Sequence, residues 1–140
     1  MRIIKTSNYD EMGRTAAIFI LNLLYQKPTA NLGLATGFTP RGLYSELIQS
    51  QGNLKMPLEQ VNFFHLDEYL NMSFKEDESM GNFLWTQLFQ PLGIPEDRIH
   101  FVPAQEADAQ NACQNYEKLI DSLGGIDLQI LGIGGNGHIA

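Results

Sequence analysis

Three short segments of the sequence carry the groups best suited to chemistry: residues 36–39, 67–68 and 134–138. The first reads Thr-Gly-Phe-Thr and is followed by Pro40, a residue favoured at the first position of a helix. Backbone N–H groups at a helix start, with roughly half a positive charge from the helix dipole, attract anions. Candidate ligands for a phosphate group are therefore Thr36, Gly37, Phe38 and Thr39. For this motif alone, a plain turn with Thr39 as the helix cap is an equally good interpretation.

The second segment places two adjacent carboxylates, Asp67 and Glu68, directly after an apolar run at 61–66. Consecutive residues on an extended backbone point to opposite sides, so the two acids cannot both face one substrate atom. One would be a base for proton abstraction, desolvated by the aromatic residues at 63, 64 and 69, and the other a structural group or a substrate contact. Taken alone, the pair is better explained as two acids that cap the strand in water. His65 in the same run is interpreted as a hydrogen-bonded core histidine, and His100 as structural.

The third segment is glycine-rich, and Gly132, Gly134 and Gly137 match the dinucleotide fingerprint G-x-G-x-x-G. Its position argues against that use, because it follows the last expected strand rather than the first. Glycines here, with Gly135 among them, would let the backbone approach a ligand closely and would expose Asn136 and His138. Histidine as a residue type can exchange protons near neutral pH, so His138 is a catalytic candidate. A tight turn with an incidental histidine is the weaker alternative.

The elements that must position these segments are strands alternating with helices. Strands are expected at 2–4, 30–35, 61–66, 99–102 and 126–133. Helices are expected after the Asn8 cap, after Pro40, around 84–89, and at 107–123. The first helix is expected to have an apolar face made of Met12, Ala16, Phe19, Ile20, Leu23 and Leu24, and the polar stretch 49–57 to lead to the next strand. Alternation of this kind predicts an α/β fold, a Rossmann-like parallel sheet with helices on both faces. Ligands bind at the carboxyl ends of such strands, so the three segments are expected to share one cleft.

Composition narrows the class of protein. The chain has 140 residues and a formal charge of −7, which disfavours general nucleic-acid binding. A single cysteine, Cys113, excludes an internal disulfide framework. The sequence shows no signal peptide and no apolar run long enough for a membrane span, so a cytoplasmic protein is expected. The chain stops after a glycine-rich turn, where a covering helix would normally follow, so we expect residues 1–140 to be the N-terminal portion of a single domain, truncated at its C-terminal side.

Together the segments LATGFTPRGLY, FHLDEYL and LGIGGNGHIA resemble the glucosamine-6-phosphate deaminase/isomerase family in order and spacing. The likeness covers essentially the whole chain. A related group, the 6-phosphogluconolactonases, shares the fold, but the Asp-Glu-Tyr sequence at 67–69 is similar to the deaminase form. The resemblance implies conversion of an amino-sugar phosphate to fructose-6-phosphate and ammonia, without cofactor or metal. The family includes single-chain and multi-subunit enzymes, so a homo-oligomer stays open.

The same resemblance implies roles for individual residues. The segment 36–39 would hold the substrate phosphate, and Asp67 would move a proton between carbons 2 and 1. His138 would assist ring opening, with Asn136 beside it; Glu68, Gly135 and Gly137 would be substrate contacts. Phe38 departs from the small residue usual in the family and would either point away or reshape the pocket. Met80 replaces a common tyrosine. The family's ring-opening glutamate and cationic phosphate ligands would fall beyond residue 140, so this chain is expected to be inactive alone.

The sequence leaves the substrate and the reaction class open between several possibilities. The preferred substrate is glucosamine-6-phosphate or its galactosamine epimer. A lactone hydrolase, in which His138 activates water, would use the same segments. A third hypothesis is a sugar-phosphate-sensing domain without catalytic activity. A nucleotide-binding domain is the fourth and least favoured hypothesis.

Overall fold

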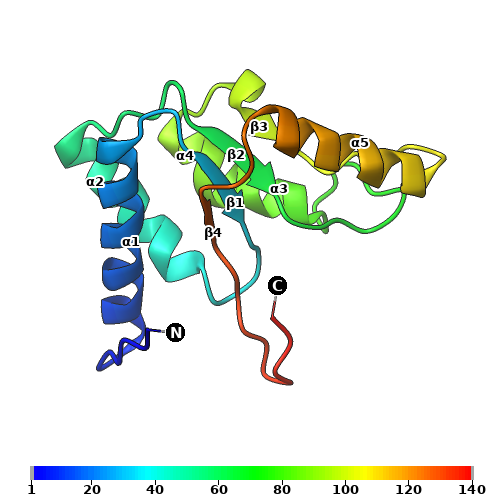
Figure 1. Cartoon of the computed structure of the whole chain (residues 1–140). Helices are drawn as coiled ribbons and strands as arrows, with labels where there is room; N and C mark the ends of the chain where they lie inside the picture. The colour runs from blue at the N-terminus through cyan, green and yellow to red at the C-terminus, as the bar shows by residue number, and fades with distance from the viewer. Residues whose placement is uncertain (1, 140) are drawn as a thin grey trace.

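The computed structural model describes residues 2–139, and its centre is a parallel sheet of four strands in the order β3-β2-β1-β4 (Figure 1). The strands are β1 (Asn31–Leu34), β2 (Asn62–His65), β3 (Ile99–His100) and β4 (Leu128–Gln129). The predicted parallel α/β sheet is therefore confirmed. The strand expected at 2–4 was wrong: these residues join no strand of the sheet, and Ile3 and Ile4 are 73% and 44% exposed.

Helices separate the strands as the sequence predicted, although some bounds differ. They are α1 (Tyr9–Gln26), α2 (Arg41–Leu54), α3 (Met80–Leu84), the π-helix η1 (Trp85–Phe89), α4 (Gln90–Leu92), the 3-10 helix η2 (Glu96–Arg98) and α5 (Ala109–Ser122). Asn8 caps α1, accepting a hydrogen bond from the Glu11 N–H at 2.9 Å. The polar stretch at 49–57 was wrongly expected to be a crossing, because α2 continues through most of it to Leu54.

The main core lies on the face of the sheet that α1, α2 and the α3–α4 run cover. The buried residues of α1 are Gly13, Ala17, Ile20 and Leu24, so the predicted burial of Ile20 and Leu24 is confirmed. Met12 and Phe19, which were also expected on the apolar face, are 36% and 44% exposed. Helices α1 and α2 approach closely at Gly13: a Cβ on Gly13 would lie only 2.7 Å from the Gly42 carbonyl carbon.

Helix α5 lies against the other face, so the prediction of helices on both faces is confirmed. Its Tyr116 hydroxyl contacts the backbone carbonyl oxygens of His65 and His100, at 2.8 and 2.7 Å. The Phe64 ring of β2 stacks on the His100 ring of β3, with ring centroids 4.6 Å apart. Because Tyr116 reaches both β2 and β3, it joins α5 to two strands at once.

His65 is buried at 2% exposure, as expected of a core residue, but it is not hydrogen-bonded through its ring. Neither ring nitrogen has a partner within residues 2–139, and the ring packs edge-on against Phe101. Burial lowers the pKa of the imidazole despite the nearby carboxylates of Glu68 and Asp67. The predicted hydrogen bond was wrong because the strand directs this side chain into an aromatic neighbourhood.

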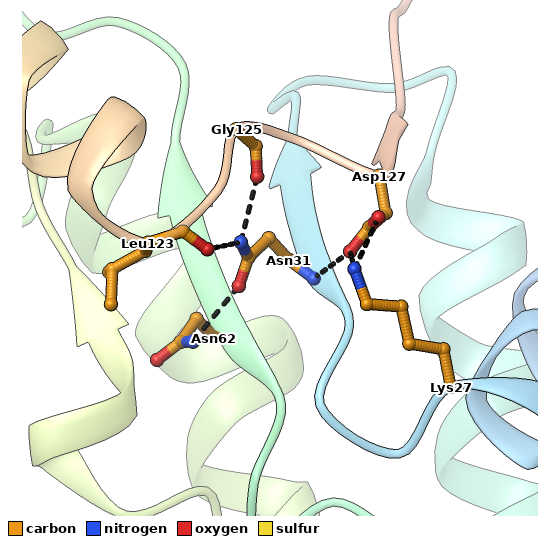
Figure 2. A network of polar contacts seen from close by, with 6 residues as sticks. All are labelled: Lys27, Asn31, Asn62, Leu123, Gly125 and Asp127. Carbon is orange, nitrogen blue, oxygen red and sulfur yellow. Dashed lines mark hydrogen bonds and ion pairs between the residues drawn. The ribbon is translucent and has the colours of Figure 1, made fainter.

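A polar network joins the amino ends of the strands (Figure 2). Asn31 is 2% exposed, and its side-chain amide donates to the carbonyl oxygens of Leu123 and Gly125 at 2.8 and 2.7 Å. Its side-chain oxygen accepts a hydrogen bond from Asn62 at 2.9 Å. Its backbone N–H donates to Asp127, which also pairs with Lys27 at 2.7 Å. The network therefore fixes the turn after α5 and the start of β4 to β1.

Candidate active site

A cavity of about 380 Å³ opens at the carboxyl ends of β1, β2 and β4. It is lined by all three segments singled out in the sequence, together with residues between them: Thr36, Gly37, Phe38, Thr39, Asp67, Met80, Gly132, Ile133, Gly134, Gly135 and His138. The predicted convergence of the three segments in one cleft is thus confirmed. It follows from the topology, because parallel neighbouring strands deliver their carboxyl ends to one edge of the sheet.

The first segment forms a turn whose shape depends on glycine. Gly37 has a φ of 86°, in the left-handed region that side chains disfavour, and no atom lies within 4 Å of where its Cβ would be. Thr39 does not cap α2, contrary to the alternative interpretation, since the cap residue is Pro40 and makes no side-chain hydrogen bond. The Thr39 hydroxyl instead donates to the Ile133 carbonyl and accepts from the Ile133 N–H, both at 3.2 Å. The Thr39 hydroxyl therefore links the turn at 36–39 to the start of the glycine-rich segment.

Phe38 was expected either to point away from the pocket or to reshape it. Phe38 lines the cavity, and its ring stacks on Tyr9 of α1, with centroids 5.0 Å apart and planes at 27°. Phe38 remains 74% exposed. A bulky residue is therefore accommodated at this turn because α1 offers an aromatic surface beside it.

The two acids after β2 lie in different environments. Asp67 is exposed and lines the cavity, whereas Glu68 is half-buried and is not among the lining residues of the described chain. Of the two acids, one of which was expected to be desolvated, Asp67 is not covered by the aromatic residues: the side chains of Phe63 and Phe64 are buried in the body of the sheet, and Tyr69 is 56% exposed. Extended backbone thus separates the acids as expected, with one carboxylate facing the cleft.

Glu68 holds the start of α3. Its carboxylate accepts hydrogen bonds from the Ser79 hydroxyl at 2.5 Å, the Gly81 N–H at 3.0 Å and the Met80 N–H at 3.3 Å. Burial acts to raise the pKa of Glu68, but these bonds and one from the Tyr69 N–H outweigh it and hold the pKa below its usual 4.5. Glu68 is thus bound to the protein, and its expected contact with a substrate stays a prediction. Through the Met80 N–H it also holds Met80, the position that departs from the tyrosine common in the family and that lines the cavity.

We expect Glu68→Gln to lower stability by about 1 kcal/mol at neutral pH, a value discounted for solvent screening. The sign of the pH dependence follows from the lowered pKa. The contribution of Glu68 is present above its unfolded pKa, near 4.5, and is lost as the pH falls through the lower folded value. Urea denaturation at a series of pH values should therefore show wild type and Glu68→Gln converging in acid. The exposed Glu59→Gln is the control, and a constant gap between Glu68→Gln and wild type at all pH values would contradict the prediction.

The third segment is a tight hairpin held by its own backbone. The Gly137 N–H donates to the Gly134 carbonyl at 2.9 Å, and the Gly134 N–H donates to the His138 carbonyl at 2.7 Å. The Asn136 side-chain oxygen accepts from the His138 N–H at 3.0 Å, and Gly137 has a φ of 84°. Gly135 and His138 line the cavity, whereas Asn136 and Gly137 shape the turn and are not among the lining residues described.

The chemistry available in the cavity is proton transfer at a small anionic ligand. Asp67 supplies a carboxylate, His138 an imidazole, and the turn at 36–39 supplies hydroxyl and backbone groups. Within residues 2–139, no three His, Cys, Asp or Glu side chains gather closely enough to hold a metal ion. The same part of the chain contains no helix of sufficient length and apolarity to cross a membrane.

Comparison with known proteins agrees with this geometry. The family model described as glucosamine-6-phosphate isomerases/6-phosphogluconolactonase matches residues 7–140. Glucosamine-6-phosphate deaminases from Clostridium botulinum (strain Loch Maree / Type A3) and Clostridium tetani are each 42% identical over 139 residues, 99% of this chain. The chain spans only 57% and 58% of the length of these two relatives.

Solved structures give the same result. A monomeric glucosamine-6-phosphate deaminase superposes with a TM-score of 0.94 at 34% identity, over 99% of this chain and 58% of that one. A 6-phosphogluconolactonase from Thermotoga maritima gives a TM-score of 0.79 at 27% identity, over 99% of this chain and 62% of that one. The fold predicted for the chain is therefore found in both groups of enzymes.

Proposed function

Because this chain belongs to the glucosamine-6-phosphate isomerase/6-phosphogluconolactonase family, we propose that the whole protein is a cytoplasmic glucosamine-6-phosphate deaminase. It would convert the amino-sugar phosphate, or its galactosamine epimer, and water to the ketose phosphate and ammonia. Residues 1–140 would form the N-terminal portion of its single domain and would be inactive without the remainder. The observation that carries the proposal is the cavity in which Asp67, His138 and the turn at 36–39 meet.

The arrangement suits two separate proton-transfer steps. The proton at carbon 2 becomes acidic only after the sugar ring opens to expose the carbonyl at carbon 1. We assign ring opening to His138, which Asn136 orients by accepting its backbone N–H. We assign transfer of the carbon 2 proton to carbon 1 to Asp67, through an enediol-type intermediate that carries the amino group on carbon 2. Protonation at carbon 1 leaves an imine at carbon 2, which water hydrolyses to the ketose and ammonia. The two groups come from different turns, so each can act on its own atom.

The phosphate would be bound by the turn at 36–39. The N–H groups of this turn precede α2, whose positive dipole end favours an anion. Thr36 and Gly37 offer a hydroxyl and an unhindered backbone. Thr39 contributes chiefly through its backbone, since its hydroxyl proton is directed to Ile133.

A 6-phosphogluconolactonase is the second candidate, because the Thermotoga maritima lactonase shares the fold and His138 could activate water in this cavity. The sequence Asp67-Glu68-Tyr69 favours the deaminase. We predict that the full-length protein releases ammonia from glucosamine-6-phosphate and leaves 6-phosphogluconolactone at its spontaneous hydrolysis rate. A coupled ammonia assay and a lactone-hydrolysis assay on one preparation check this. Lactonase activity alone, or sugar-phosphate binding without turnover, would overturn the deaminase proposal in favour of the hydrolase or of a sensing domain.

A further inference from the structure

The turn at 36–39 is held from behind by Tyr9, the first residue of α1. The Tyr9 hydroxyl lies 2.6 Å from the Phe38 carbonyl oxygen and 3.2 Å from that of Thr39. It also accepts a hydrogen bond from the Gly42 N–H at 2.9 Å. A tyrosine hydroxyl has one proton, so it donates chiefly to the nearer carbonyl, that of Phe38. Three backbone groups around the turn therefore contact one side chain from another helix, and the Phe38 carbonyl also accepts a hydrogen bond from the Arg41 N–H at 3.3 Å.

This contact determines which way the turn presents its peptide groups. The peptide between Phe38 and Thr39 is trans, since the described chain contains no cis peptide bond. In a trans peptide the C=O and N–H point in opposite directions. With the Phe38 carbonyl directed at Tyr9, the Thr39 N–H points away from Tyr9.

Tyr9 is not among the residues that line the cavity. Phe38 and Thr39 both line it, and Phe38 together with Tyr9 also borders a separate groove over α1 and α2. The orientation matters for an anion, because a carbonyl oxygen facing a phosphate repels it and an N–H attracts it. Tyr9 thus engages the carbonyl oxygens of Phe38 and Thr39 in the turn.

We infer that Tyr9 is a positioning residue for the phosphate of the substrate, acting through the backbone of Phe38 and Thr39. The inference rests on the proposed function both for the identity of the substrate and for the phosphate site at 36–39. Tyr9 itself does not line the cavity. It sets the peptide orientation on which an anion site built from backbone N–H groups depends.

The chain offers a matched control at the other end of the same two helices. The Tyr25 hydroxyl of α1 donates to the Leu54 carbonyl of α2 at 3.1 Å, far along both helices from the cavity. Tyr9→Phe and Tyr25→Phe each remove one hydroxyl that links α1 to α2. Tyr9→Phe keeps the ring that stacks on Phe38. Both variants should lose similar stability, but only Tyr9→Phe should weaken phosphate binding.

The experiment measures inorganic phosphate binding by calorimetry and steady-state kinetics on glucosamine-6-phosphate, using the full-length protein. In Tyr9→Phe we expect the phosphate Kd and the KM to rise together by about five- to tenfold, the change expected for one lost hydrogen bond, with kcat within about twofold. Tyr25→Phe should match wild type in all three. An unchanged phosphate Kd in Tyr9→Phe, or an equal rise in Tyr25→Phe, overturns the inference.

The outcomes separate this inference from the proposed function. If wild type releases no ammonia but Tyr9→Phe alone weakens phosphate binding, the positioning role stands and the deaminase proposal fails. If wild type releases ammonia and Tyr9→Phe leaves phosphate binding unchanged, the deaminase proposal stands and the positioning role of Tyr9 fails. Should Tyr9→Phe not fold, an amide NMR titration of wild type with inorganic phosphate decides. The Thr39 N–H signal must then move on binding, and its failure to move overturns the inference.

Discussion

Asp67→Asn in the full-length protein is expected to lower kcat for ammonia release by roughly 10²–10⁴-fold, the usual cost of losing a positioned base. Asparagine has nearly the same shape but cannot accept the proton from carbon 2. Asp67 is exposed at the cavity and the neighbouring Glu68 is bound by Ser79 and backbone N–H groups, so the described chain offers no second carboxylate at this position. Steady-state ammonia assays at saturating substrate give the measurement.

Two controls make the Asp67 result specific. Asp77→Asn removes an exposed carboxylate from the loop that follows β2 without touching the cavity lining, and should leave kcat unchanged. The phosphate Kd of Asp67→Asn should equal that of wild type, because the turn at 36–39 is unaltered. An Asp67→Asn enzyme with the wild-type rate would exclude this residue as the base.

Asn31→Ala is expected to have the largest effect on stability, about 3 kcal/mol, with a fall in Tm of about 10 °C. The substitution leaves the carbonyl oxygens of Leu123 and Gly125 and the amide of Asn62 without the partner that Figure 2 shows. Buried polar groups that lose their partners cost about 1–3 kcal/mol each, partly offset by water that enters the space. Thermal and urea unfolding measure the change.

Asn53→Ala provides the comparison for Asn31→Ala. Asn53 is an exposed residue of α2 whose amide donates only to the Gln49 carbonyl in the same helix, at 3.2 Å. Its replacement should change the free energy of unfolding by no more than about 0.5 kcal/mol. Equal effects of the two substitutions would show that the network at the amino ends of the strands contributes little.

The order of elements and the location of the site could be predicted from the sequence because both depend on local patterns. Apolar runs followed by polar turns marked β1, β2 and β4, and alternation with helices required a parallel sheet. Parallel strands bring their carboxyl ends together, so the grouping of Gly37, Asp67 and His138 followed from topology alone. The family resemblance rested on the same turns.

Errors arose where a residue's partner is distant in sequence. Periodicity identified Ile20 and Leu24 of α1 but not the buried Gly13, because Gly13 is buried by its approach to Gly42 of another helix. The strand expected at 2–4 had suitable residues, but a strand exists only with a neighbour to pair with. Neither property is encoded within a short window of sequence.

The sequence by itself determined that this protein has an α/β fold with its polar turns at one edge of a parallel sheet, since these features follow from periodicity and chain order. Only the tertiary structure decided what each polar group does there. Glu68 binds the start of α3, Thr39 binds the backbone of Ile133, and Tyr9 donates to the Phe38 carbonyl of the turn at 36–39. The physical reason is that a hydrogen bond requires two groups within about 3 Å, and packing, not sequence separation, sets that distance.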